Sequence, residues 1–164
     1  MITKTAIRKA RVFAIAISII CFLSSTLIAR AAAWNGIEPL KSRREEVLKI
    51  LGKPVREIDS GALQFQVAGG AVIISFVDEK FINAKKLRSE LLGTVLEIVL
   101  QHDGSSETPE TLKLSNNKSF IRDATNNAVV FRNPRDGIVY TFINGKLRTT
   151  RYTFSDTQLG RARK

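Results

Sequence analysis

The chain has 164 residues, the size of one ordinary domain, and 44% of them are hydrophobic, which excludes wholesale disorder. Lys and Arg outnumber Asp and Glu by 26 to 15, so the formal net charge is +11 at pH 7. Residues 1–33 hold five of the basic side chains and no acidic one, which leaves 21 basic and 15 acidic side chains, a net charge of +6, for the remainder.

Residues 1–33 have the parts of a secretory signal peptide: a basic start, an apolar run and an alanine-rich exit. Cleavage after Ala31 or after Ala33 would place small residues at positions −3 and −1 before the cut, as a signal peptide requires. An uncleaved membrane anchor is the alternative, because residues 12–29 nearly reach the ~18 apolar residues of a spanning helix. The polar residues 24–26 dilute that run and favour cleavage. We therefore expect an extracytoplasmic protein, either periplasmic or secreted.

The only cysteine, Cys21, lies inside the apolar run, and Ile20 before it is not the small residue that lipoprotein processing needs. Cleavage would leave a chain without cysteine. Such a chain has no disulfide, no thiol nucleophile and no thiolate metal site.

A short helix is predicted over residues 43–51. Ser42 and Glu45 have the spacing of a capping box, and Gly52 followed by Pro54 ends the helix. We expect it to bury one apolar stripe made of Val47, Leu48, Ile50 and Leu51. Just before it, Trp34 and Ile37 are predicted to pack on its first turns, with an exposed aromatic anchor for a partner as the alternative.

A β-hairpin is predicted next, because residues 63–67 alternate with period two and a second apolar run covers 71–77. A two-residue turn at Gly69-Gly70 pairs Val67 with Val72, Phe65 with Ile74 and Leu63 with Phe76. All six apolar side chains then share one face of the sheet.

The middle of the chain is predicted as a loop over 78–92 with one helical turn near 84–91, and then a strand over 94–100. Residues 101–107 are expected to form a polar linker, and 109–113 a short helix that starts with a proline.

A meander of strands is predicted from residue 119 to 154, with Asn144-Gly145 as the turn of its last hairpin. A two-residue loop pairs Phe142 with Leu147, Tyr140 with Thr149, Thr141 with Arg148 and Val139 with Thr150. The register of the Asn126-Asn127 hairpin stays open. Residues 34–160 are expected to form one α+β domain, and 161–164 a frayed basic tail.

Residues 34–54 resemble the opening of exported bacterial proteins with the SmpA/OmlA-like and β-lactamase-inhibitor-protein-like fold. The shared features are an Ile–Pro-Leu step, a capped helix with Val47 at its centre, and Leu-Gly-x-Pro at its end. The resemblance implies a curved antiparallel sheet with short helices on one face, built from two helix-plus-strands units. It also implies a protein that binds partners and is not a catalyst.

Three departures from the family limit what the resemblance implies. The cap reads Ser42-Arg43-Arg44 where the family has Ser-Thr-Arg, and both the lipidation cysteine and the inhibitors' paired cysteines are absent. Neither barrel assembly nor β-lactamase inhibition is therefore carried over to this chain.

Few residues are candidates for catalysis or metal binding. His102 beside Asp103 lies in the polar linker, where solvation is the simpler interpretation, and one His without Cys cannot build a structural zinc site. Asp78-Glu79 is interpreted as a turn at a strand end. We expect no cofactor, no metal and no enzymatic activity. A small carboxylate-based hydrolase is the alternative, because a fold can bring two acids together from anywhere in the chain.

The function predicted from the sequence is binding of an envelope protein or an anionic polymer through the open face of the sheet. Export and the interleaved acidic residues argue against nucleic acid. The alternative is that this face of the sheet is simply exposed to water and binds no partner. The residues predicted to bind the partner are Gln64, Gln66, Thr141, Arg148, Thr150 and Tyr152.

Overall fold

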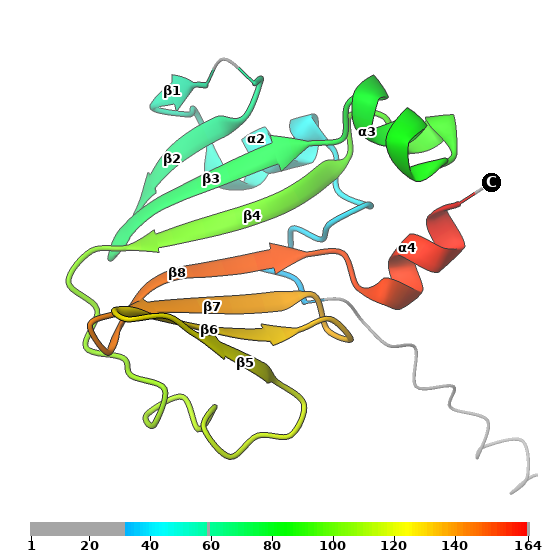
Figure 1. Ribbon diagram of the computed structural model, residues 1–164. Coiled ribbons are helices and arrows are strands. Elements are labelled where there is room, and N and C mark those ends of the chain that lie inside the picture. The colour runs from blue at the N-terminus through cyan, green and yellow to red at the C-terminus, as the bar shows by residue number, and fades with distance from the viewer. Residues whose placement is uncertain (1–31, 59, 164) are drawn as a thin grey trace, which may run out of the picture.

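The computed structural model describes residues 32–58 and 60–163 (Figure 1). This part of the chain is α+β, as predicted: one open eight-stranded antiparallel sheet in the order β1-β2-β3-β4-β8-β7-β6-β5, with three short helices. The predicted signal peptide lies outside the described residues, except for its last two. None of the described helices has the length and apolar character needed to cross a membrane.

The sheet has two halves that meet where β4 pairs with β8. The first half consists of β1 (Arg56–Glu57), β2 (Leu63–Val67), β3 (Gly70–Phe76) and β4 (Val95–His102). The second consists of β5 (Ile121–Ala124), β6 (Ala128–Asn133), β7 (Ile138–Ile143) and β8 (Lys146–Thr153). The helices are α2 (Arg44–Leu51), α3 (Glu79–Lys85) and α4 (Asp156–Ala162), and a 3₁₀ turn, η1, covers Ser89–Leu91.

Helix α2 exists as predicted, but its cap is one residue later than expected. Arg43 is the N-cap, and its backbone N–H donates to Glu46 Oε2 at 3.2 Å. The buried Ser42 hydroxyl instead accepts from the backbone N–H of Glu38, so it closes the preceding turn. The predicted Ser42–Glu45 capping box is therefore wrong.

The predicted apolar stripe of α2 is only partly buried. Val47 is fully buried in the core beneath the helix, and Leu51 is half-buried against the same core. Leu48 and Ile50 are 36% and 44% exposed. A helix of two turns touches the sheet along one line, so the side chains on either side of Val47 face away from it.

The first hairpin forms, with its turn one residue earlier than predicted. Ala68-Gly69 is the turn, Val67 pairs with Gly70, Phe65 with Val72 and Leu63 with Ile74. Gly70 is the first residue of β3, where it pairs with Val67 and His102, and a side chain is excluded there because a Cβ would lie 1.9 Å from the carbonyl oxygen of Gln101 on β4. The pairing moves by two residues, and this even shift leaves the predicted faces unchanged. Leu63, Phe65, Val72 and Ile74 are accordingly in the core.

Residues 78–92 contain more helix than predicted. Helix α3 begins directly after β3, with Asp78 as a cap that accepts from the backbone N–H of Phe81 at 2.7 Å. The predicted helical turn near 84–91 is present as η1, and α3 is an additional helix before it. The α3 and η1 segments meet α4 in a second core cluster formed by Val77, Ile82, Leu87, Leu91 and Ala162.

The end of the chain is a helix and not a frayed tail. Ser155 and Gln158 form a reciprocal capping box at the start of α4. Ala162 is buried, and its carbonyl accepts from the backbone N–H of Arg88 at 3.0 Å. The domain therefore continues past the predicted boundary at residue 160, at least to residue 163, which bridges to Leu87.

The second half has the predicted strands without the predicted helix. Residues 109–113 form turns, with the backbone N–H of Leu114 bonded to the carbonyl of Pro109 at 2.8 Å. Leu114 is buried with Phe131, Phe142 and Leu147 in a third core cluster. The predicted polar linker also starts later, because β4 extends through Gln101 and His102.

The Asn144-Gly145 turn and the Phe142–Leu147 pair are confirmed, but the pairing slips immediately afterwards. Thr141 pairs with Thr149 and Tyr140 with Thr150, so Arg148 is the extra residue of a β-bulge. The other three predicted pairs of this hairpin are wrong for this reason. The bulge turns every later residue of β8 to the face opposite the predicted one.

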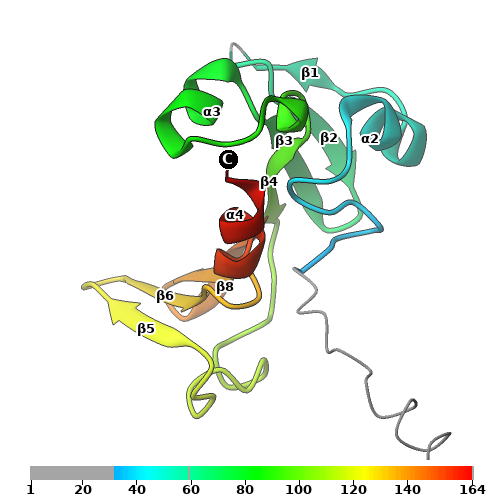
Figure 2. The same cartoon turned by 90° about the vertical axis from the view of Figure 1, so that its right-hand side faces the viewer.

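The two faces of the sheet differ in what covers them. Figure 1 shows α2 behind the sheet, and Figure 2 shows from the side that α2 stands on one side while β5 projects toward the other. The face under α2, which we call the helix side, carries the core residues of β2, β3 and β4. The opposite face, toward the viewer of Figure 1, is the open face.

Candidate functional site

The open face is built by the strand residues that alternate with the core. One row crosses six paired strands in the order Arg132, Val139, Arg151, Val99, Ile73 and Gln64. The adjacent row runs through Val130, Thr141, Thr149, Gln101, Ala71 and Gln66. Residues paired directly across neighbouring strands point to the same face of a sheet, so the side chains of both rows lie on the open face.

The centre of the open face is aliphatic and its margins are polar. Ile73, Val99 and Val139 are half-buried. Gln66 and Arg132 are exposed toward the two edges. An apolar centre within a polar rim is the composition of many protein interfaces.

The charges of this face are largely engaged with each other. Arg151 Nε lies 3.5 Å from Glu97 Oε2, and Arg132 forms an ion pair with Asp123. Arg56 Nε donates to Gln64 Oε1 at 2.6 Å. These groups are about half exposed, so the pairs fix the positions of the side chains more than they stabilise the fold.

The predicted binding residues do not all lie together. Gln64, Gln66 and Thr141 are on the open face, as predicted. Arg148 is exposed at the bulge. Thr150 and Tyr152 are on the helix side, opposite Leu100 and Ile98, so their assignment to the open face is wrong.

Four residues of the open face were not among the predicted binding residues: Ile73, Val99, Val139 and Arg151. A signal for Val99 exists in the sequence, because residues 95–100 are apolar on both faces of the strand, which is typical of a strand shielded on both sides. For Arg151 no such signal exists, because its direction depends on the bulge at Arg148.

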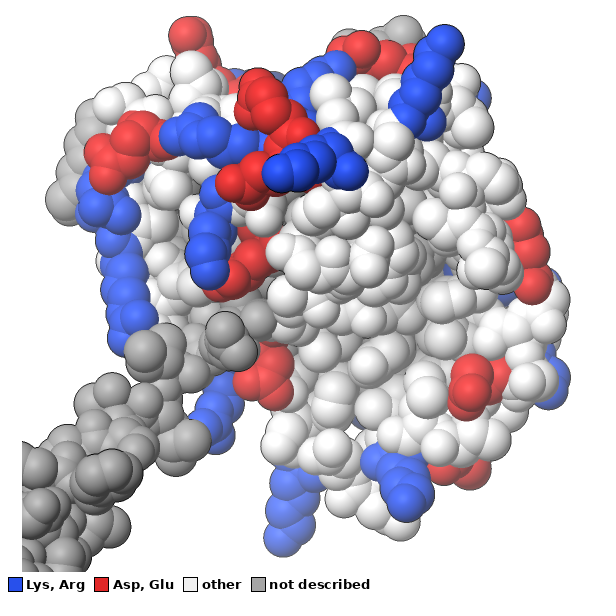
Figure 3. Space-filling model, turned by 180° about the vertical axis from the view of Figure 1, so that it is seen from behind, with Lys and Arg blue, Asp and Glu red and all other residues white. Residues whose placement is uncertain are grey.

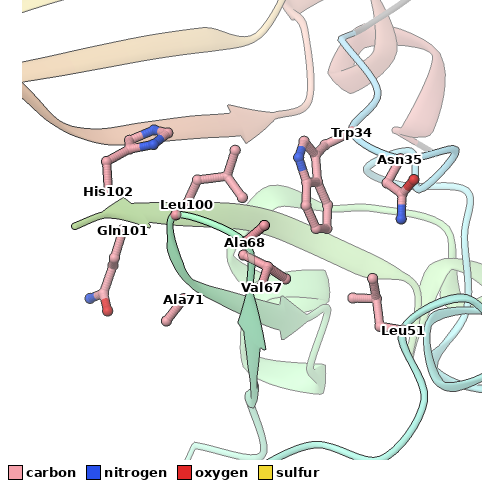
Figure 4. Close-up of a pocket in the computed structure, with 10 residues that line it drawn as sticks. Trp34, Asn35, Leu51, Val67, Ala68, Ala71, Leu100, Gln101 and His102 are labelled. Carbon is pink, nitrogen blue, oxygen red and sulfur yellow. The ribbon is translucent and has the colours of Figure 1, made fainter. Parts of the chain in front are cut away.

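A cavity of about 490 Å³ opens on the helix side (Figure 4). We call it the Trp34 cavity. Its side-chain walls come from the segment before α2, the end of α2, the first hairpin and β4, namely Trp34, Asn35, Leu51, Val67, Ala68, Leu100 and His102. In Figure 4, Leu100 and His102 project to the same side of β4, whereas Gln101 projects to the other side.

His102 is the polar side chain of β4 in this cavity, not part of a solvated linker. Its Nε2 lies 2.9 Å from Thr150 Oγ1 on β8. Partial burial lowers the pKa of His102 below its ordinary value. The imidazole is therefore neutral at pH 7.

Trp34 packs as predicted on the core near α2, but it also forms a wall of the cavity. Its backbone is fixed by two hydrogen bonds with Ile37, of 3.0 and 2.8 Å. Ile37 is fully buried, so it anchors the segment that holds the indole in place.

Within residues 32–58 and 60–163, no three His, Cys, Asp or Glu side chains come close enough to hold a metal ion. Comparisons with protein-family models, with curated proteins and with solved structures give no match to this chain.

Proposed function

We propose that this chain is an exported, non-catalytic protein that binds a protein partner through the open face of its sheet. The observation that carries the proposal is the aliphatic row of Ile73, Val99 and Val139, which spans both halves of the sheet on the face opposite α2. Covering such a row with a partner removes apolar surface from water, the main source of affinity in protein association.

A protein partner fits the open face better than an anionic polymer does. A polyanion is held by unpaired basic groups, but Arg151 and Arg132 are already paired with Glu97 and Asp123. A protein that presents an apolar centre and both signs of charge at its rim can use all of these groups.

We also propose that the sheet is curved and consists of two equivalent units. One unit is α2 with β2–β4, and the other is the segment 105–120 with β6–β8. In this plan α2 and the segment 105–120 cover the same face of the sheet. The symmetric strand order about the β4–β8 seam supports this plan, as does the burial of Leu114 under the second half.

The alternative, a small carboxylate-based hydrolase, needs a carboxyl group that stays protonated. Glu97 and Asp123 are paired with Arg151 and Arg132 and do not face another carboxyl group in these pairs. The pKa of Glu110 is lowered, chiefly by a backbone hydrogen bond. These carboxyl groups therefore support binding more than acid catalysis.

The experiment compares two variants with the same chemical change in a capture assay from the envelope fraction of cells that make the protein. Thr141→Arg places a long charged side chain in the middle of the open face, and Thr157→Arg places it on the exposed surface of α4. We expect Thr141→Arg to release a partner that wild type and Thr157→Arg retain. Equal capture by all three would contradict the proposed surface.

A further inference from the structure

We propose that the Trp34 cavity binds a small uncharged ring compound that carries a hydroxyl group. The cavity opens on the helix side, and Ala71 and Gln101 are the members of the open-face rows that also line it, whereas Ile73, Val99 and Val139 do not. Its volume of about 490 Å³ lies within the range of about 300–1,000 Å³ that is usual for small-molecule sites.

The lining of the cavity explains why the ligand is uncharged. Among the residues that line it there is no Lys, Arg, Asp or Glu. Figure 3 shows this side of the molecule, where the charged side chains gather in the upper left and upper middle of the view and leave a broad white area beside them. An ion that entered the cavity would lose hydration without gaining a counter-charge, which is costly.

The shape and chemistry of the walls explain the ring. The indole of Trp34 forms one flat wall, and Leu51, Val67 and Leu100 supply aliphatic surface around it. An apolar ring can cover the indole face and fill the space above Leu100 at the same time. Because Trp34 and Leu100 are held by the core, the site exists before the ligand binds.

The hydrogen-bonding state of His102 explains the hydroxyl group. Its Nε2 is engaged with Thr150, and among the described residues Nδ1 has no hydrogen-bond partner. A neutral imidazole offers either a donor or an acceptor at Nδ1, depending on the tautomer. A hydroxyl group can accept from the first form and donate to the second, so it matches both.

The test uses Trp34 as the reporter, because it is the only tryptophan of the chain. The purified protein is titrated with 4-methylcyclohexanol, which does not absorb where Trp34 is excited, and with methylcyclohexane as the ligand without a hydroxyl. We expect a saturable change in Trp34 emission with both, and a dissociation constant about fivefold lower for the alcohol, the worth of one hydrogen bond.

Three variants complete the experiment. Ala68→Leu fills the cavity from an exposed turn and should abolish both titrations, whereas Ala124→Leu adds the same bulk at the exposed end of β5 and should leave both unchanged. His102→Leu should remove the preference for the alcohol and keep binding of the hydrocarbon. No saturable response in wild type, or unchanged binding in Ala68→Leu, would overturn the site. An unchanged preference in His102→Leu would overturn the role of the hydroxyl.

Discussion

His102 and Thr150, 48 residues apart in sequence, place Nε2 and Oγ1 2.9 Å from each other across the seam between β4 and β8. The contact lies on the helix side, beside the Trp34 cavity. It joins the two halves of the sheet by side chains in addition to the backbone ladder. Thr150 is only 3% exposed, so its hydroxyl depends on this contact for a partner.

Removal of that hydroxyl tests the seam. Thr150→Val keeps the shape of the side chain and loses the hydrogen bond, so the free energy of unfolding should fall by about 0.5–1.5 kcal/mol. Thr149→Val on the open face of the same strand is the matched control and should change it by less than about 0.5 kcal/mol. Urea unfolding measures both, and equal effects would mean that the bulge does not separate the two threonines.

The pH dependence of stability follows from the lowered pKa of His102. When the folded state binds the proton less tightly than the unfolded state, stability falls as the pH drops below the ordinary imidazole value of about 6.5. His102 is the only histidine of the chain, so no other imidazole contributes. We expect the unfolding midpoint of wild type to fall more between pH 8 and pH 5 than that of His102→Gln. Parallel pH profiles would contradict the burial of the ring.

The tyrosines offer a spectroscopic test of the second register. The chain has two, Tyr140 and Tyr152, and burial raises the pKa of both, that of Tyr152 further through the charge of Tyr140. An absorbance titration of the phenolate should therefore show no tyrosine ionising at the ordinary value of about 10. A tyrosine that titrates normally in wild type and is lost in Tyr152→Phe would contradict the burial of Tyr152 on the helix side.

Gly104 and Gly137 have nearly the same φ angle, so replacing each by alanine distinguishes the cost of a left-handed backbone from the cost of a steric clash. Gly104 has φ of +67° and open space where a Cβ would stand, whereas Gly137 has φ of +70° and the carbonyl oxygen of Thr153 2.1 Å from that point. Gly104→Ala should destabilise by about 1–2 kcal/mol through the left-handed backbone alone. Gly137→Ala should cost about 1–3 kcal/mol more, because the strand beside it must move. Equal costs in thermal or urea unfolding would show that β8 does not approach Gly137.

Local features of the fold could be predicted from the sequence where a pattern is compatible with only one arrangement of the side chains. The alternation in residues 63–67 assigned the correct faces even though the turn moved, because an even shift preserves the side-chain direction. At Arg148 a single extra residue reversed the faces of Thr150 and Tyr152. Nothing in the sequence of that hairpin marks the bulge, because Asn144-Gly145 sets only the first pairs.

The helix caps could not be predicted from residue type alone. Ser42 has the residue type of a helix cap but is occupied by the backbone of Glu38. Ser155 has the same type, and with Gln158 it forms the capping box of a helix that the sequence analysis passed over. The residue types permit both outcomes, and the tertiary contacts of the neighbouring chain decide between them.

The central claim is that the open face of the sheet holds a partner, and site-specific photocrosslinking tests it most directly. A benzophenone amino acid is placed at Val139 on the open face, or at the exposed Ile50 on α2 as a control, in cells that make the protein. The account predicts one adduct of defined mass from Val139, its loss when Thr141→Arg is added, and none from Ile50. An adduct from Ile50 with none from Val139 would contradict it.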